Sequence, residues 1–517
     1  MKNNKERLIG AALMAFLPIL LCVLRALANG EGLFDVWFCG SNWQDELFYY
    51  QLTSGVVSHG IPQGYFGYNE GAAPYLTFGT WSPLLLIFWS LFGVIFGWNV
   101  LAPVLCNILL MSIALFIFVW LVRPGKLQLA VMALLISALT PFSRFMMSCM
   151  PEIPALFTVI IMLACWYPCL NTYKKTYMTT AYIFFFIGVL MRPYLALLIL
   201  IPLIIELRRK KIKAVLPAGV FVVSLFIYAV ITKMLSSPYF TNEVGTSWMT
   251  LFFTEGLGAG FKFIIDKLRT AGAQAVGCIW PGLRYGEGGS AYYGIFFAFI
   301  LLFAFLGIKS IKCKRKEAAV TASFAVMLIG MILAIILMYK IGVGARHLFG
   351  FIFTGCLILG METFGNNGID KINLVASLGV FLAFCWVFIY KGTDNYYYHV
   401  SYRSDGIDWV ENIEKQLDGK MELTKGVSWD NTVVWVSVDH SPGEEDYSET
   451  LWRMLYAIPD GFALNICTSD FTYENLEALK SGFIATVPGG TVECKMLETG
   501  IGKEIARNDY FVMYDIR

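Results

Sequence analysis

The chain has 517 residues, of which 57% are hydrophobic and 15% charged. A soluble protein carries about 25% charged residues, so this composition excludes a water-soluble globular protein and places most of the chain in lipid. The net charge of +2, with no basic stretch interleaved with aromatic residues, gives no sign of a nucleic-acid-binding surface.

The first apolar segment lies close to the N-terminus, at residues 8–27. It is longer than the roughly 7–15 apolar residues of a secretory signal, so we expect an uncleaved membrane span, although residues 26–28 resemble a cleavage site. Residues 29–80 form a polar loop rich in aromatic residues and glycine. Residues 84–98 are apolar, follow Pro83 and have no basic residue at either end, which favours a helix lying along the membrane surface.

Ten further segments are apolar enough to cross the membrane, since a span needs about 20 apolar residues and fewer inside a bundle. Together with residues 8–27 they predict about eleven crossings. The ten segments are residues 101–122, 127–142, 153–170, 178–190, 194–207, 214–231, 292–308, 318–339, 348–361 and 372–390.

Basic residues collect on alternate loops between these spans. The clusters are Arg123 and Lys126; Lys174 and Lys175; Arg208, Arg209, Lys210, Lys211 and Lys213; Lys312, Lys314, Arg315 and Lys316; and Lys371. If residues 84–98 do not cross, all of them fall on the same side as Lys2, Lys5 and Arg7. By the positive-inside rule we expect a multi-pass plasma-membrane protein with a cytoplasmic N-terminus and with everything after residue 390 outside.

The composition changes after residue 390, where the chain becomes charged and alternating. We expect helices at residues 407–417, 448–457 and 473–481, and strands at residues 432–439, 462–467, 483–487 and 510–515. The sequence thus predicts an α-helical polytopic membrane domain over residues 1–390, with interfacial helices in its first external loop, and a small extracytoplasmic α/β domain over residues 391–517. In that compartment Cys467 and Cys494 are compatible with a disulfide or with two buried thiols.

Three acids are predicted on the outer face of the bundle. Asp45 and Glu46 follow the first span among aromatic residues, and alone they fit a solvated pair that caps a local helix. Glu152 opens another span, where the helix dipole also favours an acid. A carboxylate at the join with the bundle is usually functional when it faces a wet cavity.

Isolated cations stand on the same face, each at the outer end of an apolar span and against the positive-inside trend. They are Arg144, Arg192, and Arg346 with His347. Any one of them is explained by a side chain that reaches for lipid head groups. Several on one side favour a phosphate site, because arginine binds phosphate through paired hydrogen bonds and keeps its charge when partly desolvated.

Acids and arginines at one membrane surface match the needs of sugar transfer from a polyprenyl phosphate. The phosphate is already a good leaving group, so the reaction needs one carboxylate to take the acceptor's proton and cations to hold the departing charge. Attack opposite the leaving group inverts the anomeric carbon. The sequence therefore predicts an inverting hexosyltransferase whose acceptor is a hydroxyl group of a glycan, a lipid or a protein.

This arrangement resembles the GT-C superfamily of integral-membrane glycosyltransferases, and most closely its protein O-mannosyltransferase and lipid A aminoarabinose transferase branch. Residues 45–46 match the Asp-Glu pair in the first external loop of those enzymes. Residues 81–93 are similar to their His-Pro-Pro-like element and interfacial helix, but lack the His. Residues 143–144 with Glu152 resemble their Arg-rich turn and the Glu that opens the fourth span, and residues 192–193 their basic turn before the sixth. The resemblance covers roughly the predicted membrane domain.

By this resemblance Asp45 is the base, Glu46 supports it, and Glu152 is a second acid for the acceptor or for a divalent cation. Metal dependence is left open, and no other cofactor is expected. The residues expected to contact the donor phosphate are Arg192, Arg346, His347 and Arg144. Candidates for stacking on sugar rings, or for the interfacial aromatic belt, are Tyr49, Tyr65, Tyr68 and Trp81.

Two other functions fit parts of the sequence. A transporter or flippase of lipid-linked saccharides needs polar residues at the bilayer midplane and repeated halves, whereas this chain has little charge there and no halves. An O-antigen-type polymerase would centre its chemistry on the outer loop at residues 236–291, whose basic residues are Lys262, Lys267, Arg269 and Arg284. Dependence of activity on Asp45 and Glu152 separates a glycosyltransferase from both.

Overall fold

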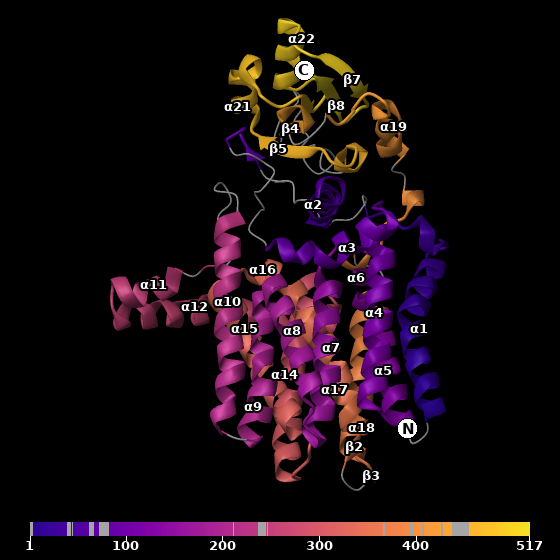
Figure 1. The fold of residues 1–517 in the computed structure, drawn as a ribbon, viewed down its shortest axis with the longest axis vertical. Coiled ribbons are helices and arrows are strands. Elements are labelled where there is room, and N and C mark those ends of the chain that lie inside the picture. Colours follow the sequence, from indigo (N-terminus) through magenta and orange to yellow (C-terminus); the bar gives the residue numbers. More distant parts are fainter. Residues whose placement is uncertain are drawn as a thin grey trace.

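The computed structural model describes residues 4–38, 43, 45–60, 67–71, 82–209, 211–235, 245, 247–365, 368–392, 396–405, 408–424, 428–436 and 454–517. A bundle of long helices carries a small sheet domain at one end (Figure 1). The start of the first helix lies at the end of the bundle that is far from the sheet domain, so the two ends of the chain lie on opposite sides of the bundle.

Eight helices in the described part of the chain are long and apolar enough to cross a membrane. They are α1 (Asn4–Ala28), α4 (Ala102–Val122), α7 (Glu152–Asn171), α10 (Val215–Leu235), α14 (Gly288–Lys312), α15 (Ala318–Met338), α17 (Leu348–Glu362) and α18 (Lys371–Phe384). Short turns extend three of these spans: η6 (Lys211–Ala214) precedes α10, α16 (Ile341–Gly344) and η7 (Ala345–His347) precede α17, and the π-helical η8 (Cys385–Tyr390) follows α18.

The other three predicted crossings are shorter helices inside the bundle. They are α5 (Lys126–Ala138), α8 (Lys175–Met191), and η5 (Pro193–Ile199) followed by α9 (Leu200–Arg209). A short α6 (Pro141–Met146) follows α5. Neighbouring helices cover these segments, with α5 against α17 and α18 and α8 against α7. The predicted polytopic helical fold is therefore confirmed, with eight spans of full length.

The predicted interfacial helix consists of η4 (Pro83–Leu86) and α3 (Ile87–Phe96). Ser82 Oγ accepts a hydrogen bond from the Leu84 N–H, and proline suits the first helical position because it needs no N–H there. α3 has 10 residues, too few to cross a bilayer. It lies across the end of the bundle in Figure 1.

Contacts between loops gather the basic clusters at one end of the bundle. Lys126 Nζ lies 3.2 Å from Glu6 Oε1, which joins α1 to the start of α5. The Arg209 guanidinium lies 3.3 Å from the centroid of the Tyr173 ring. Lys309 Nζ lies 2.7 Å from Asp370 Oδ1, which joins the end of α14 to the start of α18. This is the end at which the chain begins, as predicted, and its assignment to the cytoplasm stays a prediction.

The predicted outer loop at residues 236–291 contains helices that the sequence analysis did not predict. They are α11 (Ser247–Thr254), α12 (Leu257–Gly277) and α13 (Ile279–Tyr285). α11 and α12 project sideways from the bundle beside α10 (Figure 1).

The C-terminal domain is a six-stranded sheet in the order β1-β5-β4-β6-β8-β7. The strands β4 (Thr432–Val436), β5 (Ala463–Cys467) and β6 (Phe483–Thr486) are parallel, and β8 (Val512–Asp515) and β7 (Lys503–Arg507) are antiparallel additions. Successive residues of β4 face opposite sides. Val433 and Trp435 belong to the hydrophobic core that continues into the bundle, and Val434 and Val436 to a second core.

The four predicted strands correspond to β4, β5, β6 and β8, and the first predicted helix to α19 (Asp408–Leu417). Of the second, residues 454–457 form η12 (Met454–Ala457) and the rest lies outside the described residues. The third, at residues 473–481, is wrong: α21 (Ser469–Glu474) begins earlier because Thr468 Oγ1 caps it by accepting from the Phe471 N–H, and only η13 (Leu476–Ala478) follows. The helix α22 (Thr491–Thr499) was not predicted.

Two details concern the cysteines and the first outer loop. Cys467 and Cys494 are not bonded to each other; the first is buried and the second exposed. The loop contributes β1 (Gly67–Tyr68), which pairs in parallel with β5. The sheet domain thus includes a strand that lies far from it in the sequence.

Candidate active site

Helix α2 (Asp45–His59) begins with the predicted acid pair. Acids in the first turn are favoured by the helix dipole, which agrees with the alternative interpretation of a pair at the start of a local helix, but Glu46 is buried and not solvated as that interpretation requires. α2 lies between the bundle and the sheet domain (Figure 1). The two acids differ in exposure, because 26% of the Asp45 side chain is exposed and that of Glu46 is fully buried.

The other acid and the cations predicted at the site stand at helix ends on the same side of the bundle as α2. Glu152 is the first residue of α7. Arg192 closes α8 in an extended conformation, which the following Pro193 imposes on it. Arg346 and His347 form the turn that leads into α17.

Arg346 joins the two acids that were predicted to converge. Its Nη2 lies 2.6 Å from Asp45 Oδ2, and its Nε lies 4.0 Å from Glu152 Oε1. Arg192 Nη2 donates to the same Glu152 oxygen at 3.1 Å, and His347 Nδ1 lies 3.6 Å from it. The structure therefore brings together five predicted site residues from four separate parts of the chain.

Glu46 and Arg144 form a second buried pair beside this cluster. Arg144 Nη1 donates to Glu46 Oε1 at 3.2 Å, and the guanidinium lies 3.9 Å from the centroid of the Trp43 ring. Trp43 stacks in turn on Phe145. Arg144 is thus held between a carboxylate and an indole, which suits support of α2 better than direct contact with a donor phosphate.

The aromatic candidates fall in different places. The Tyr49 ring is fully buried near Trp89, so its face is covered by protein and not available to a sugar. Burial and the nearby Asp45 charge raise the pKa of its hydroxyl, which therefore stays neutral. Tyr68 lies in β1, with its backbone paired to Ile466. Tyr65 and Trp81 lie outside the described residues.

An apolar cavity of about 340 Å³ opens beside the cluster. Arg192 and His347 belong to its wall, and the rest is almost entirely apolar or aromatic. The lining residues include Phe221, Leu225 and Tyr228 of α10, Met331, Ala334, Ile335 and Met338 of α15, Met249 of α11, and Tyr194, Ala196 and Leu197 of η5.

Two aromatic residues at this site were missed from the sequence. Tyr194 and Tyr339 line the cavity and flank the His347 ring, with ring centroids 5.4 and 5.3 Å away. Their sequence signal is weak, since each is a single tyrosine at the end of an apolar segment. Only the adjacent Arg192-Pro193 turn marks the first of them.

The donor set does not fit a divalent cation. Asp45 and Glu152 both face guanidinium groups, whose positive charge opposes a second cation at the same oxygens. Within the residues that the structure describes, no three His, Cys, Asp or Glu side chains are grouped to hold a metal ion.

No family model and no curated protein matches the chain. Among solved structures, it is similar to ArnT from Cupriavidus metallidurans bound to undecaprenyl phosphate, with a TM-score of 0.44, 12% identity, and coverage of 98% of this chain and 97% of that chain. It is also similar to ArnT from the same organism in the apo state, with a TM-score of 0.42, 12% identity, and coverage of 91% and 93%. At this TM-score and identity the likeness carries no argument about function.

Proposed function

We propose that the protein is an inverting glycosyltransferase that moves a sugar from a polyprenyl phosphate to a hydroxyl acceptor at the outer membrane surface. The observation that carries this proposal is the apolar cavity whose wall includes Arg192 and His347, next to the acids Asp45 and Glu152.

The cavity matches the two halves of such a donor. Its apolar wall between α10 and α15 suits the first part of a prenyl chain, because both helices are membrane spans and the chain can continue into lipid. Arg192 and His347 suit a phosphate at the polar end, since a guanidinium holds phosphate by charge and by directed hydrogen bonds. A free nucleotide sugar would leave the apolar part without a partner.

The reaction requires one proton transfer and one exchange of bonds. The acceptor oxygen forms a bond to the anomeric carbon while Asp45 takes the hydroxyl proton. The bond between the anomeric carbon and the phosphate oxygen breaks, and its electron pair stays on the phosphate. Protonation of Asp45 cancels the charge that Arg346 faces at 2.6 Å, so the guanidinium charge becomes available to the departing phosphate.

The two acids have different roles in this scheme. Asp45 fits the base because its side chain is 26% exposed, whereas that of Glu152 is 2% exposed. Glu152 lies among Arg192, Arg346 and His347 and fixes their positions at the donor site. A buried carboxylate enclosed by cations is poorly placed to reach an acceptor hydroxyl.

Specific observations disfavour the alternatives. A transporter needs polar residues at the bilayer midplane. In the described chain, the buried ion pairs of the spans lie instead at helix ends, as Glu152–Arg192 and Arg315–Glu362 do. The basic residues that supported a polymerase lie exposed on α12 and α13, outside the cluster.

The test uses the full chain in its native membrane. Cell-surface glycans and glycolipids are compared by mass spectrometry in cells with the wild-type protein, with the Asp45→Asn variant and without the protein. We expect one sugar modification that needs the wild-type protein and is lost in the variant at equal protein level. Identical glycan profiles in all three would overturn the proposal.

A further inference from the structure

The sheet domain holds the helix that carries Asp45. Hydrogen bonds join the two: Gln51 Nε2 donates to Leu455 O at 2.6 Å, Ser54 Oγ donates to Asp460 Oδ1 at 2.9 Å and accepts from the Gly461 N–H at 3.2 Å, and His59 Nε2 lies 2.8 Å from Gly461 O. These partners lie in η12 or in the segment between η12 and β5. The domain therefore covers α2 on the side that faces away from the bundle (Figure 1).

Aromatic rings fill the same contact. Tyr456 of the domain packs on Tyr50 of α2, with ring centroids 5.2 Å apart, and on Phe38 at 5.0 Å. Tyr50 stacks in turn on Trp98, which lies between α3 and α4. The apolar contacts thus run without a break from the bundle through α2 into the domain, as the shared hydrophobic core also shows.

A second attachment follows α2 along the chain, where the loop joins the sheet. Asn69 N donates to Ile466 O and Thr468 N donates to Asn69 Oδ1, both at 3.0 Å, which extends the β1–β5 pairing by one residue. The next residue, Glu70, donates its N–H to Asn465 Oδ1, also at 3.0 Å.

The Glu70 carboxylate completes this attachment. Its Oε2 accepts from the Lys480 N–H at 2.7 Å, and its Oε1 accepts from the Ser481 N–H at 2.8 Å. The residue is 6% exposed. Both of its oxygens thus bind backbone donors of the turn before β6, and the buried Ser481 N–H would otherwise lack this partner.

The backbone at this attachment is strained. Asn69 has φ 49° and Glu70 has φ 50°, a left-handed conformation that residues other than glycine rarely adopt. Two such residues in succession persist only where the surrounding contacts fix them. Here the bonds to β5 and to the turn before β6 supply those contacts.

We propose that Glu70 is a positioning residue for Asp45, and that through it the sheet domain acts as a clamp on the reaction site. The loop is then fixed at three points: at Asp45 by Arg346, along α2 by the segment before β5, and at Glu70 by the turn before β6. Release of the third point removes one of the attachments that hold the sheet domain over α2. The proposal rests on the function proposed for Asp45.

The expected kinetic signature separates positioning from donor binding. The donor cavity is lined by residues of α10, α11, α15 and η5, together with Ser82, Leu85, Met191, Arg192, Tyr339 and His347, and no described residue of the sheet domain is among them. Loss of the Glu70 contact should therefore lower turnover by about 10–100-fold, the cost of displacing a reacting group by about 1 Å. Binding of a polyprenyl phosphate should remain unchanged.

The experiment compares the full-length variants Glu70→Ala and Glu70→Gln with the wild type, in native membranes for turnover and in lipid nanodiscs for binding and hydrogen exchange. Glu477→Gln, an exposed acid of the same domain, is the matched control. Turnover is followed as the sugar modification in membranes, binding is measured with undecaprenyl phosphate, and hydrogen exchange reports the order of α2. We expect lower turnover, equal binding and faster exchange in α2 for Glu70→Ala, an intermediate effect for Glu70→Gln, and no effect for the control.

The outcomes separate this inference from the proposed function. Wild-type turnover in Glu70→Ala, or unchanged exchange in α2, overturns the positioning role. Equal loss of binding and turnover also overturns it, because the whole fold is then affected. Absence of any sugar modification by the wild type overturns the proposed function instead, and leaves the exchange measurement to test the clamp alone.

Discussion

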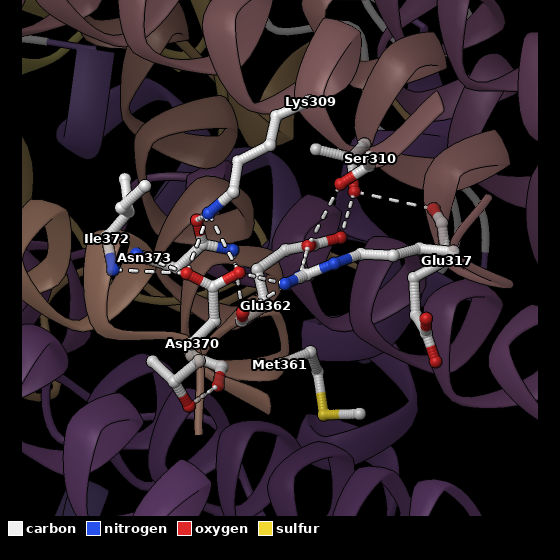
Figure 2. A network of polar contacts seen from close by, with 12 residues as sticks. Lys309, Ser310, Glu317, Met361, Glu362, Asp370, Ile372 and Asn373 are labelled. Carbon is white, nitrogen blue, oxygen red and sulfur yellow. Dashed lines mark hydrogen bonds and ion pairs between the residues drawn. The ribbon is translucent and has the colours of Figure 1, made fainter. Parts of the chain in front are cut away.

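Two charge networks lie at opposite ends of the helix bundle. We call the one at the end where the chain begins the inner network, and the one around Glu152 the outer network. At the end where the chain begins, Glu362 accepts from Arg315 Nη1 at 2.7 Å, from Ser310 Oγ at 3.2 Å and from Thr321 Oγ1. Asp370 accepts from Lys309 Nζ at 2.7 and 2.8 Å and also from Arg315. Figure 2 shows Lys309, Ser310, Glu362 and Asp370 of this network close to one another.

The network at the other end is less complete. Among the described residues, Glu152 Oε2, Arg192 Nε, Arg346 Nε and His347 Nδ1 are buried without a hydrogen-bond partner. No polar atom of the Lys309, Arg315, Glu362 or Asp370 side chains is in that position. A satisfied network holds helix ends together, whereas unmet donors beside an apolar cavity mark a site that can take a ligand.

The largest effect is expected from Asp45→Asn, which keeps the shape of the side chain and removes the base. Sugar transfer should fall by about 10²–10⁴-fold, the usual contribution of a general base. Thermal unfolding of the purified protein and the sugar modification in membranes measure stability and activity separately. Normal transfer in this variant would show that the outer network is as purely structural as the inner one.

The converse effect is expected at the inner network from Arg315→Met, which leaves Glu362 and Asp370 without this partner. Breaking a buried pair by removing one member costs about 3–5 kcal/mol of stability. Denaturant unfolding in detergent should show this loss, while transfer per folded molecule stays unchanged. A matched double variant with Glu362→Leu should recover stability, because the unpaired charge is then removed as well.

A smaller change in activity is expected from Arg192→Ala. The substitution removes the cation that both lines the cavity and binds Glu152. Binding of a polyprenyl phosphate should weaken by about 10–100-fold, the worth of a charge-assisted hydrogen bond of about 1.5–3 kcal/mol, while affinity for the acceptor changes less. Arg192→Lys should recover part of the loss through charge alone. Equal weakening for donor and acceptor would remove the phosphate role.

Much of the fold could be predicted because lipid imposes a simple rule on the sequence. Long apolar segments gave the spans, and Pro83 together with the absence of flanking cations gave the interfacial helix at α3. The basic loops fell on one side as the contacts of Lys126 and Lys309 require. Strand β7 was not predicted because its first two residues, Lys503 and Glu504, are both exposed at a sheet edge. Its sequence therefore lacks the alternation of polar and apolar residues that a half-buried strand has.

The site could be predicted only as a set of residues on one face. The isolated charges Asp45, Glu152 and Arg346 stand out against apolar segments, so their types and their side of the membrane were evident. Which of these charges pair with one another could not be predicted, since the pairing depends on how four distant segments pack. The parallel pairing of Tyr68 with Ile466 was hidden for the same reason, and so was the contact of Glu70 with the sheet.

The smallest effect concerns the acidity of the inner network. Burial opposes ionisation, yet hydrogen bonds from Lys309 and Asn373 and the charge of Arg315 hold the pKa of Asp370 below its usual value. A carboxyl whose pKa is lowered by folding stabilises the protein above its unfolded pKa of about 3.9, and this contribution is lost as the pH falls through the folded pKa. Asp370→Asn should therefore cost roughly 1 kcal/mol at neutral pH, the difference between a charged and a neutral hydrogen bond, and nothing at acid pH. Thermal unfolding of variant and wild type across the pH range measures this gap. If the difference in stability between variant and wild type persists in acid, Asp370 acts through its shape and not through its charge. Complete charge pairing would then no longer distinguish the inner network from the outer one.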